Sequence, residues 1–208
     1  MLQSLIQFDS GLFILINSHN NVVLDWVFWL ITQLGNGWIV VPVLIGVIWV
    51  KTPRSQVKKV LICGLLSIAI SGIVNTQLKL LVKRPRPISY YKSKPYDPSL
   101  APSAPKDFPT ERLYDSVAVH IVGPALKRNS FPSGHTNLAF SASVLLIFLY
   151  GGVFWTTLIP ASLVAYSRVY MGVHFPLDTA AGAVVAVVSV SSVLLICRVR
   201  RKSSGRKE

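Results

Sequence analysis

Long apolar blocks, separated by short basic segments, constrain this chain more than any other feature of its sequence. Residues 36–50 and 57–82 form the first two strongly apolar blocks, and three more run over about 135–151, 153–171 and 176–197. Hydrophobic residues make up 51% of the 208 residues and charged residues only 14%, whereas a soluble domain carries about 25% charged residues. The blocks predict transmembrane helices within a single membrane domain, residues 1–208.

Residues 1–35 are less regular than the rest of the chain. A polar break covers residues 17–21, and the apolar stretch 22–34 contains Asp25 and is too short to span a bilayer. We predict two interfacial or re-entrant helices here, with one poorly formed transmembrane helix over 11–34 as the alternative. The predicted fold class is therefore all-α, a polytopic bundle of five to six transmembrane helices with N-terminal interfacial helices.

The distribution of basic residues predicts the orientation of the bundle. The loop 51–59 carries four Lys or Arg residues, and the tail 198–208 is equally basic. Five spans place both segments on one side, which the positive-inside rule assigns to the cytoplasm. Residues 83–134 contain nine prolines, which predicts a long extracytoplasmic loop on the opposite face. The net charge of +13 would also suit nucleic acid, but basic residues placed between apolar blocks favour anionic lipids, so we expect no nucleic-acid partner.

Three polar clusters lie at the outer ends of predicted spans, so that one bundle can bring them together. They are KLLVKRPRP at 79–87, PSGH at 132–135 and SRVYMGVHFPLD at 167–178. Lys79, Arg86 and Arg168 supply cations that suit phosphate oxygens. Ser133 and Gly134 precede a predicted helix, whose first N–H groups and dipole favour an anion. The clusters predict a cage for a tetrahedral oxyanion.

Two histidines and one carboxylate complete these clusters. Asp178 follows His174 by four residues, about one helical turn, so that its carboxylate can reach one nitrogen of the imidazole. Such a contact fixes the tautomer and makes the other nitrogen a better nucleophile. His135 is placed to protonate a leaving oxygen as a general acid. Each residue alone has an ordinary structural explanation, but their joint occurrence on one face indicates a catalytic site.

The three clusters resemble the signature of the PAP2 family, the type 2 phosphatidic acid phosphatases, in its bacterial form. That signature reads K-x6-R-P, then P-S-G-H, then S-R-x5-H-x3-D, and this chain fills every position, from Lys79 to Asp178. Arg84-Pro85 also reads R-P, but only Arg86-Pro87 lies at the right distance from Lys79, so we treat Arg84 as a flanking residue.

The resemblance implies a helical membrane bundle, commonly of six helices, and a reaction that needs no metal or other cofactor. It implies that His174 forms a phosphohistidine, that Asp178 orients His174, and that His135 protonates the leaving group and then activates water. The phosphate would be held by the remaining motif residues, which are Lys79, Arg86, Ser133, Gly134 and Arg168.

The substrate is expected to be a lipid phosphate, because the site lies near the membrane boundary on the extracytoplasmic face. We rank undecaprenyl diphosphate first, ahead of phosphatidylglycerophosphate, phosphatidic acid and lipid A phosphates. The rival functions are phosphotransfer between lipids and a non-catalytic membrane transporter. We expect the protein to lie in the inner (plasma) membrane, with its active site on the periplasmic face and its C-terminus in the cytoplasm. The oligomeric state is left open. Basic loop residues would either read a second phosphate or sugar or remain solvated, namely Lys106, Arg112, His120, Lys127 and Arg128.

Overall fold

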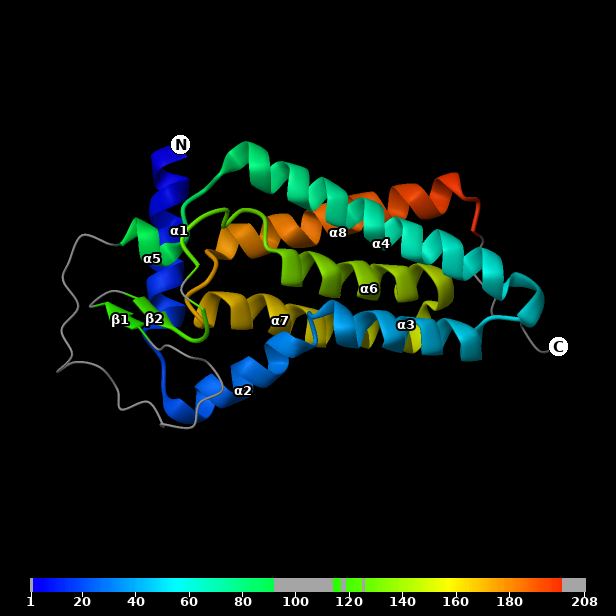
Figure 1. The fold of residues 1–208 in the computed structure, drawn as a ribbon, viewed down its shortest axis with the longest axis horizontal. Coiled ribbons are helices and arrows are strands. Elements are labelled where there is room, and N and C mark those ends of the chain that lie inside the picture. Colours follow the sequence, from blue (N-terminus) through cyan, green and yellow to red (C-terminus); the bar gives the residue numbers. More distant parts are fainter. Residues whose placement is uncertain (1, 92–113, 117–118, 125, 200–208) are drawn as a thin grey trace.

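Long helices run side by side along the long axis of the molecule (Figure 1). The computed structural model describes residues 2–91, 114–116, 119–124 and 126–199. The long helices are α3 (Gly37–Lys51), α4 (Arg54–Val82), α6 (Gly134–Tyr150), α7 (Leu158–Tyr170) and α8 (Pro176–Ile196). α8 packs against both α4 and α6. Each long helix coincides with one predicted apolar block, so the largely helical fold is confirmed.

Smaller elements gather at one end of these helices. Helix α1 (Leu2–Asn17) lies across this end, beside the short helix α5 (Pro87–Tyr90) and an antiparallel hairpin (Figure 1). The hairpin joins β1 (Tyr114–Ser116) to β2 (Val119–Ile121). A further short element, the 3₁₀ helix η2 (Gly152–Thr157), connects α6 to α7 at the opposite end of the bundle (Figure 1). The hairpin, two strands of three residues each within the 83–134 segment, is a small exception in a fold that is mostly helical, as predicted.

The polar break near residue 20 separates two helices. α1 ends at Asn17, and α2 (Val22–Gln33) begins after Asn21, whose side-chain oxygen accepts from the Leu24 N–H at 2.9 Å. A single helix over 11–34 is therefore wrong. α2 and α3 are bent by 51° relative to each other, and together they are long and apolar enough to cross a membrane. The N-terminal segment thus contributes one helix across the end of the bundle and the first half of a bent helix pair, which forms either a broken span or a re-entrant loop.

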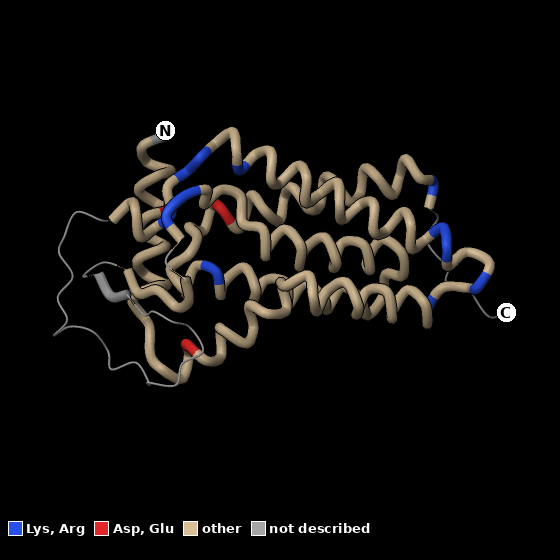
Figure 2. The backbone as a smooth tube through the Cα atoms, in the orientation of Figure 1, with Lys and Arg blue, Asp and Glu red and all other residues tan. Residues whose placement is uncertain are grey.

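The number of membrane spans is supported only in part. Within the described residues, the segment containing α4 and helix α8 are each long and apolar enough to span, and the bent pair α2–α3 makes a third candidate. α6 and α7 are shorter, at 17 and 13 residues. Figure 2 shows that Lys and Arg gather at the two ends of the long helices and leave their middle uncharged. This charge-free middle is typical of a bundle that crosses a bilayer.

Candidate active site

The structure brings all the predicted site residues to the end of the bundle that α1 covers. They come from the last turns of α4 and α7, the segment before α5, the start of α6, the turn between α7 and α8, and the first turn of α8. In chain order they are Lys79, Arg86, Ser133, Gly134, His135, Arg168, His174 and Asp178. Residues up to 99 positions apart in the sequence therefore share one site.

Two of the arginines, Arg86 and Arg168, are buried and form no ion pair with a carboxylate among the described residues. Arg86 donates from Nε to the carbonyl of Arg128 at 2.9 Å and from Nη1 to the carbonyl of Val173 at 3.0 Å. Arg168 is 8% exposed and donates from Nη1 to Thr32 Oγ1 at 2.9 Å. Its Nε has no hydrogen-bond partner in the described part of the chain. A buried N–H group without a partner is costly, so this donor is available to a bound anion.

Lys79 adds a third cation to the same site. Its ammonium nitrogen lies 4.0 Å from the position that a Cβ on Gly134 would take, at the start of α6. Among the described residues, neither Lys79, Arg86 nor Arg168 forms an ion pair with a carboxylate. Three partly or fully buried positive charges without a counter-ion disfavour the empty site. The arrangement therefore favours binding of a multiply charged anion.

His174 is buried in the turn between α7 and α8. Its Nδ1 lies 3.7 Å from Asp178 Oδ2 and 3.5 Å from Ser130 Oγ, which itself donates to Asp178 Oδ2 at 2.5 Å. The direct contact between His174 and Asp178 is thus longer than a hydrogen bond, and the Ser130 hydroxyl lies close to both groups. Sequence reasoning had missed Ser130.

Burial determines the protonation state of His174. It lowers the pKa of the imidazole to about 3, and the charges of Arg86 and Arg168 act in the same direction, while Asp178 opposes them. The ring is therefore neutral at pH 7. A neutral imidazole has a free lone pair, which a nucleophile requires.

His135 lies in the first turn of α6, on the same side as the three cations. Lys79, Arg86 and Arg168 are all close enough to act on it electrostatically. The bend between α2 and α3 packs directly on this residue, because a Cβ on Gly35 would lie 3.1 Å from the Cβ of His135. Both histidines and all three cations therefore form one cluster.

Arg84, which the sequence reading treated as a flanking residue, binds two buried carboxylates. Its Nη1 lies 2.7 Å from Asp178 Oδ1, and its Nη2 lies 2.6 Å from Asp9 Oδ2. The guanidinium also stacks over the ring of Phe175, 4.1 Å from the ring centroid. Asp9 belongs to α1 and accepts from the Leu177 N–H at 2.8 Å. α1 is thereby connected to the residues that hold Asp178.

A second buried polar network fixes the position of α1 and β2. His120 Nε2 lies 2.8 Å from Asp25 Oδ1, and the Tyr170 hydroxyl donates to the same oxygen at 2.8 Å. Asn17 donates to the carbonyls of His120 and Tyr170, both at 2.7 Å. Neither alternative offered for His120, a substrate contact or a solvated side chain, fits the structure, because His120 is buried and paired with Asp25. Lys127 is exposed, whereas Lys106 and Arg112 lie outside the described residues.

Two glycines permit the close packing around the site. Gly172 has φ of +70°, and a Cβ there would lie 2.1 Å from the His120 carbonyl oxygen, so β2 packs directly on the turn that carries His174. A Cβ on Gly182 would lie 2.6 Å from the Ser133 carbonyl oxygen, which brings α8 against the start of α6. No sequence pattern identified either glycine in advance.

Ser133 differs in part from its predicted role. Its N–H donates to the carbonyl of Asp178 at 2.9 Å and so is not available to phosphate. Its hydroxyl oxygen accepts from Thr136 Oγ1 at 3.1 Å, which leaves its own O–H as a donor. Gly134 begins α6, where the first N–H groups have no partner within the helix. Its role as a phosphate ligand remains a prediction.

No group of three or more His, Cys, Asp or Glu residues lies close enough to hold a metal within the described ranges. The chemistry available there is that of two imidazoles, a carboxylate and three cations. Whether the reaction proceeds without a metal stays a prediction.

The chain is similar to proteins of one known superfamily. The model of the PAP2 superfamily matches residues 60–202. Undecaprenyl-diphosphatase BcrC of Bacillus subtilis is 26% identical over 171 residues, which cover 82% of this chain and 74% of that protein. The bacitracin transport permease protein BcrC of Bacillus licheniformis is 48% identical over 61 residues, only 29% of this chain and 30% of that protein.

A solved structure shares the fold. The crystal structure of Aquifex aeolicus LpxE superimposes with a TM-score of 0.65 at 28% identity, covering 89% of this chain and 93% of that one. The family match covers well over half of the chain and includes all three motifs. The chain therefore belongs to the PAP2 superfamily, as the resemblance of its motifs predicted.

Proposed function

We propose that this chain, a membrane lipid phosphatase of the PAP2 type, hydrolyses undecaprenyl diphosphate through a phosphohistidine on His174 and without a metal. One observation carries the proposal. Lys79, Arg86 and Arg168 surround two histidines at the end of an apolar bundle and have no carboxylate partner among the described residues. A phosphate group supplies the negative charge that these cations lack.

The first step transfers the phosphoryl group to the protein. Because Nδ1 of His174 faces Ser130 and Asp178, Nε2 is the nitrogen free to attack phosphorus. The N–P bond forms while the bond from phosphorus to the leaving oxygen breaks. With the bound phosphate offsetting the three cations, His135 is protonated and gives that proton to the leaving oxygen, so the lipid leaves with a neutral hydroxyl or as a monophosphate. Arg86 and Arg168 stabilise the charge that develops on the other phosphate oxygens.

The second step restores the protein. His135, now neutral, takes a proton from water as the water oxygen attacks phosphorus. The N–P bond breaks, inorganic phosphate leaves and His174 is again neutral. If a lipid hydroxyl took the place of water, the same intermediate would make a phosphotransferase that releases no free phosphate.

A lipid substrate suits the position of the site. The cations lie where the uncharged middle of the helices ends, at the level at which a lipid headgroup meets the hydrocarbon region. Undecaprenyl diphosphate ranks first because a relative that matches over 82% of this chain is an undecaprenyl-diphosphatase. Phosphatidylglycerophosphate, phosphatidic acid and lipid A phosphates remain alternatives. A transporter is disfavoured, because the described charges lie at the ends of the bundle and form no path through its middle (Figure 2).

The proposal includes a membrane orientation. Residues 1–208 would form one domain with five to six spans in the inner (plasma) membrane. The end opposite the site carries Lys51, Arg54, Lys58 and Lys59 (Figure 2), which supports a cytoplasmic location for that end. The active site would then face the periplasm, and the C-terminus would lie in the cytoplasm.

Phosphate release from purified protein tests the proposal. The wild type, His174→Ala and His19→Ala would be assayed in detergent with EDTA against undecaprenyl diphosphate and the alternative lipids. His19 is exposed at the end of α1 and serves as the matched histidine control. We expect release by the wild type and the control, none by His174→Ala, and an acid-labile phosphoprotein on rapid quenching. A folded wild type that releases no phosphate from any lipid would refute hydrolysis.

A further inference from the structure

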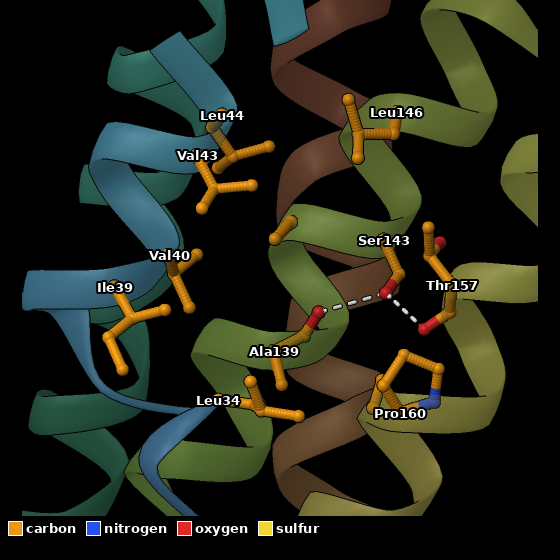
Figure 3. Close-up of a pocket in the computed structure, with 12 residues that line it drawn as sticks. Leu34, Ile39, Val40, Val43, Leu44, Ala139, Ser143, Leu146, Thr157 and Pro160 are labelled. Carbon is orange, nitrogen blue, oxygen red and sulfur yellow. Dashed lines mark hydrogen bonds between the residues drawn. The ribbon is translucent and has the colours of Figure 1, made fainter. Parts of the chain in front are cut away.

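An apolar groove lies between α3, α6 and α7 (Figure 3). Its volume is about 190 Å³, and it is lined by aliphatic side chains that include Ile39, Val43, Ala139, Ala142 and Leu146. A drug-sized ligand usually occupies a pocket of about 300–1,000 Å³. The groove therefore has room for part of a long chain molecule and not for a whole one.

The polar atoms that line the groove are already satisfied. Ser143 donates to the carbonyls of Ala139 and Thr157, each at 3.0 Å, as the dashed lines in Figure 3 show. The Thr157 hydroxyl donates to the carbonyl of Phe154 at 2.6 Å. Neither hydroxyl hydrogen is therefore available to a ligand in the groove. A hydrocarbon chain is the ligand chemistry that such a lining accepts without leaving a polar group unpaired.

One end of the groove lies close to the catalytic site. Ala139 follows His135 by four residues on α6, which places it about 6 Å further along the helix. Leu34, which also lines the groove, precedes Gly35 at the bend between α2 and α3. That bend packs on His135, because a Cβ added to Gly35 would lie 3.1 Å from the Cβ of His135. One end of the groove is thus beside the general acid.

The groove also opens on the outside of the bundle. Ile39 and Val43 on α3 are 41% and 57% exposed, and α3 carries no charged residue before Lys51. A hydrocarbon chain that leaves the groove past these residues enters the hydrocarbon region of the bilayer. The opening explains how a lipid far larger than the groove can use it.

From these observations we propose that the groove binds the first segment of the hydrocarbon tail of the lipid phosphate while its phosphate occupies the site. This inference rests on the proposed function. Bilayer lipid is as apolar as the groove, so the tail gains little hydrophobic free energy on entering it. The contribution of the groove is orientation, because it aligns the phosphate with His174 and the leaving oxygen with His135.

Substitutions that fill the groove test this role. Val43→Trp adds bulk at the exposed rim, and Ala142→Phe adds bulk to the floor. Val184→Trp is the matched control, because Val184 is 62% exposed on α8 and does not line the groove. Each variant would be assayed with undecaprenyl diphosphate in micelles and with p-nitrophenyl phosphate, which has no lipid tail. Binding of inorganic phosphate gives a further readout that is independent of turnover.

We expect kcat/KM for the lipid to fall on the order of tenfold or more in both groove variants, because a displacement of about 1 Å can cost about a hundredfold. Turnover of p-nitrophenyl phosphate, phosphate binding and the control variant should be unchanged. Unchanged lipid turnover in both variants would show that only bulk lipid fills the groove. Equal losses with all ligands would show that the groove merely supports the shape of the site. Failure of the proposed function would appear instead in the wild type, as an absence of any phosphate release.

Discussion

Replacing Arg84 with glutamine tests whether this residue positions Asp178. The substitution removes two ion pairs, at 2.6 and 2.7 Å, to carboxylates whose side chains are fully buried, while Arg84 itself is 20% exposed. Removing one partner of a buried ion pair costs about 3–5 kcal/mol. We expect the lower end of that range, because both carboxylates keep other donors. Asp178 retains the Phe175 N–H and Ser130, and Asp9 retains the Leu177 N–H.

The catalytic effect follows from geometry. Without Arg84, the Asp178 carboxylate loses the group that holds its Oδ1, and the other oxygen is the one that faces His174. A misplacement of about 1 Å lowers rates by up to about a hundredfold, so we expect kcat to fall by roughly 10- to 100-fold. KM should change little, because the Arg84 guanidinium is engaged by two carboxylates and does not face the phosphate cage.

The assay measures kcat and KM for phosphate release, the rate of phosphohistidine formation, and thermal unfolding. Lys83→Gln is the matched control, since it removes a positive charge from the neighbouring exposed residue. Asp9→Asn removes one ion pair but keeps an acceptor for Leu177, so we expect a smaller loss of kcat in the same direction. If Arg84→Gln had the kcat of Lys83→Gln, or raised KM alone, the positioning role would be wrong.

Three further predictions can be checked directly. The His174 ring should stay neutral between about pH 5 and 8 in NMR titrations, because burial lowers its pKa to about 3. In the unfolded chain the imidazole has its ordinary pKa of 6.5. The stability of the folded state should therefore decline as the pH falls from 6.5 toward 3. Gly182→Ala would place a Cβ 2.6 Å from the Ser133 carbonyl oxygen, so we expect a loss of about 1–3 kcal/mol in the free energy of unfolding, measured by denaturation, together with lower activity. Incubation with EDTA should leave phosphate release unchanged, and a loss that added metal restores would contradict the proposed chemistry.

The sequence was sufficient to predict the long helices and the grouping of the three motifs. Apolar blocks of the right length mark helices whatever their neighbours are, and residues at the ends of adjacent antiparallel helices meet at one face. Lys79, Arg168 and Asp178 lie together for this reason. Predicting that the three motifs lie together required only the positions of the helix ends and the order of the helices along the chain, and both can be read from local sequence.

The contacts around Arg84 could not be found in this way. Arg84 and Asp9 are 75 residues apart, and the pairing depends on α1 lying across the end of the bundle, which no local pattern dictates. A partial indication was present, because Asp9, Phe13 and Asn17 recur every four residues and form the buried face of α1. His120 was misassigned for the same reason, since its partner Asp25 lies 95 residues away.

The arrangement of charges explains why α1 contributes a carboxylate at all. If Arg84 formed an ion pair with Asp178 alone, it would cancel the negative charge of Asp178. The imidazole of His174, however, becomes positively charged when it accepts the phosphoryl group. Because Asp9 shares the same guanidinium, the three groups together retain one negative charge beside that imidazole. Arg84 can then fix the direction of Asp178 without removing its electrostatic effect, while Lys79, Arg86 and Arg168 remain free for the phosphate. The helix across the end of the bundle is in this sense part of the catalytic site, and its removal should lower kcat even where the long helices stay folded.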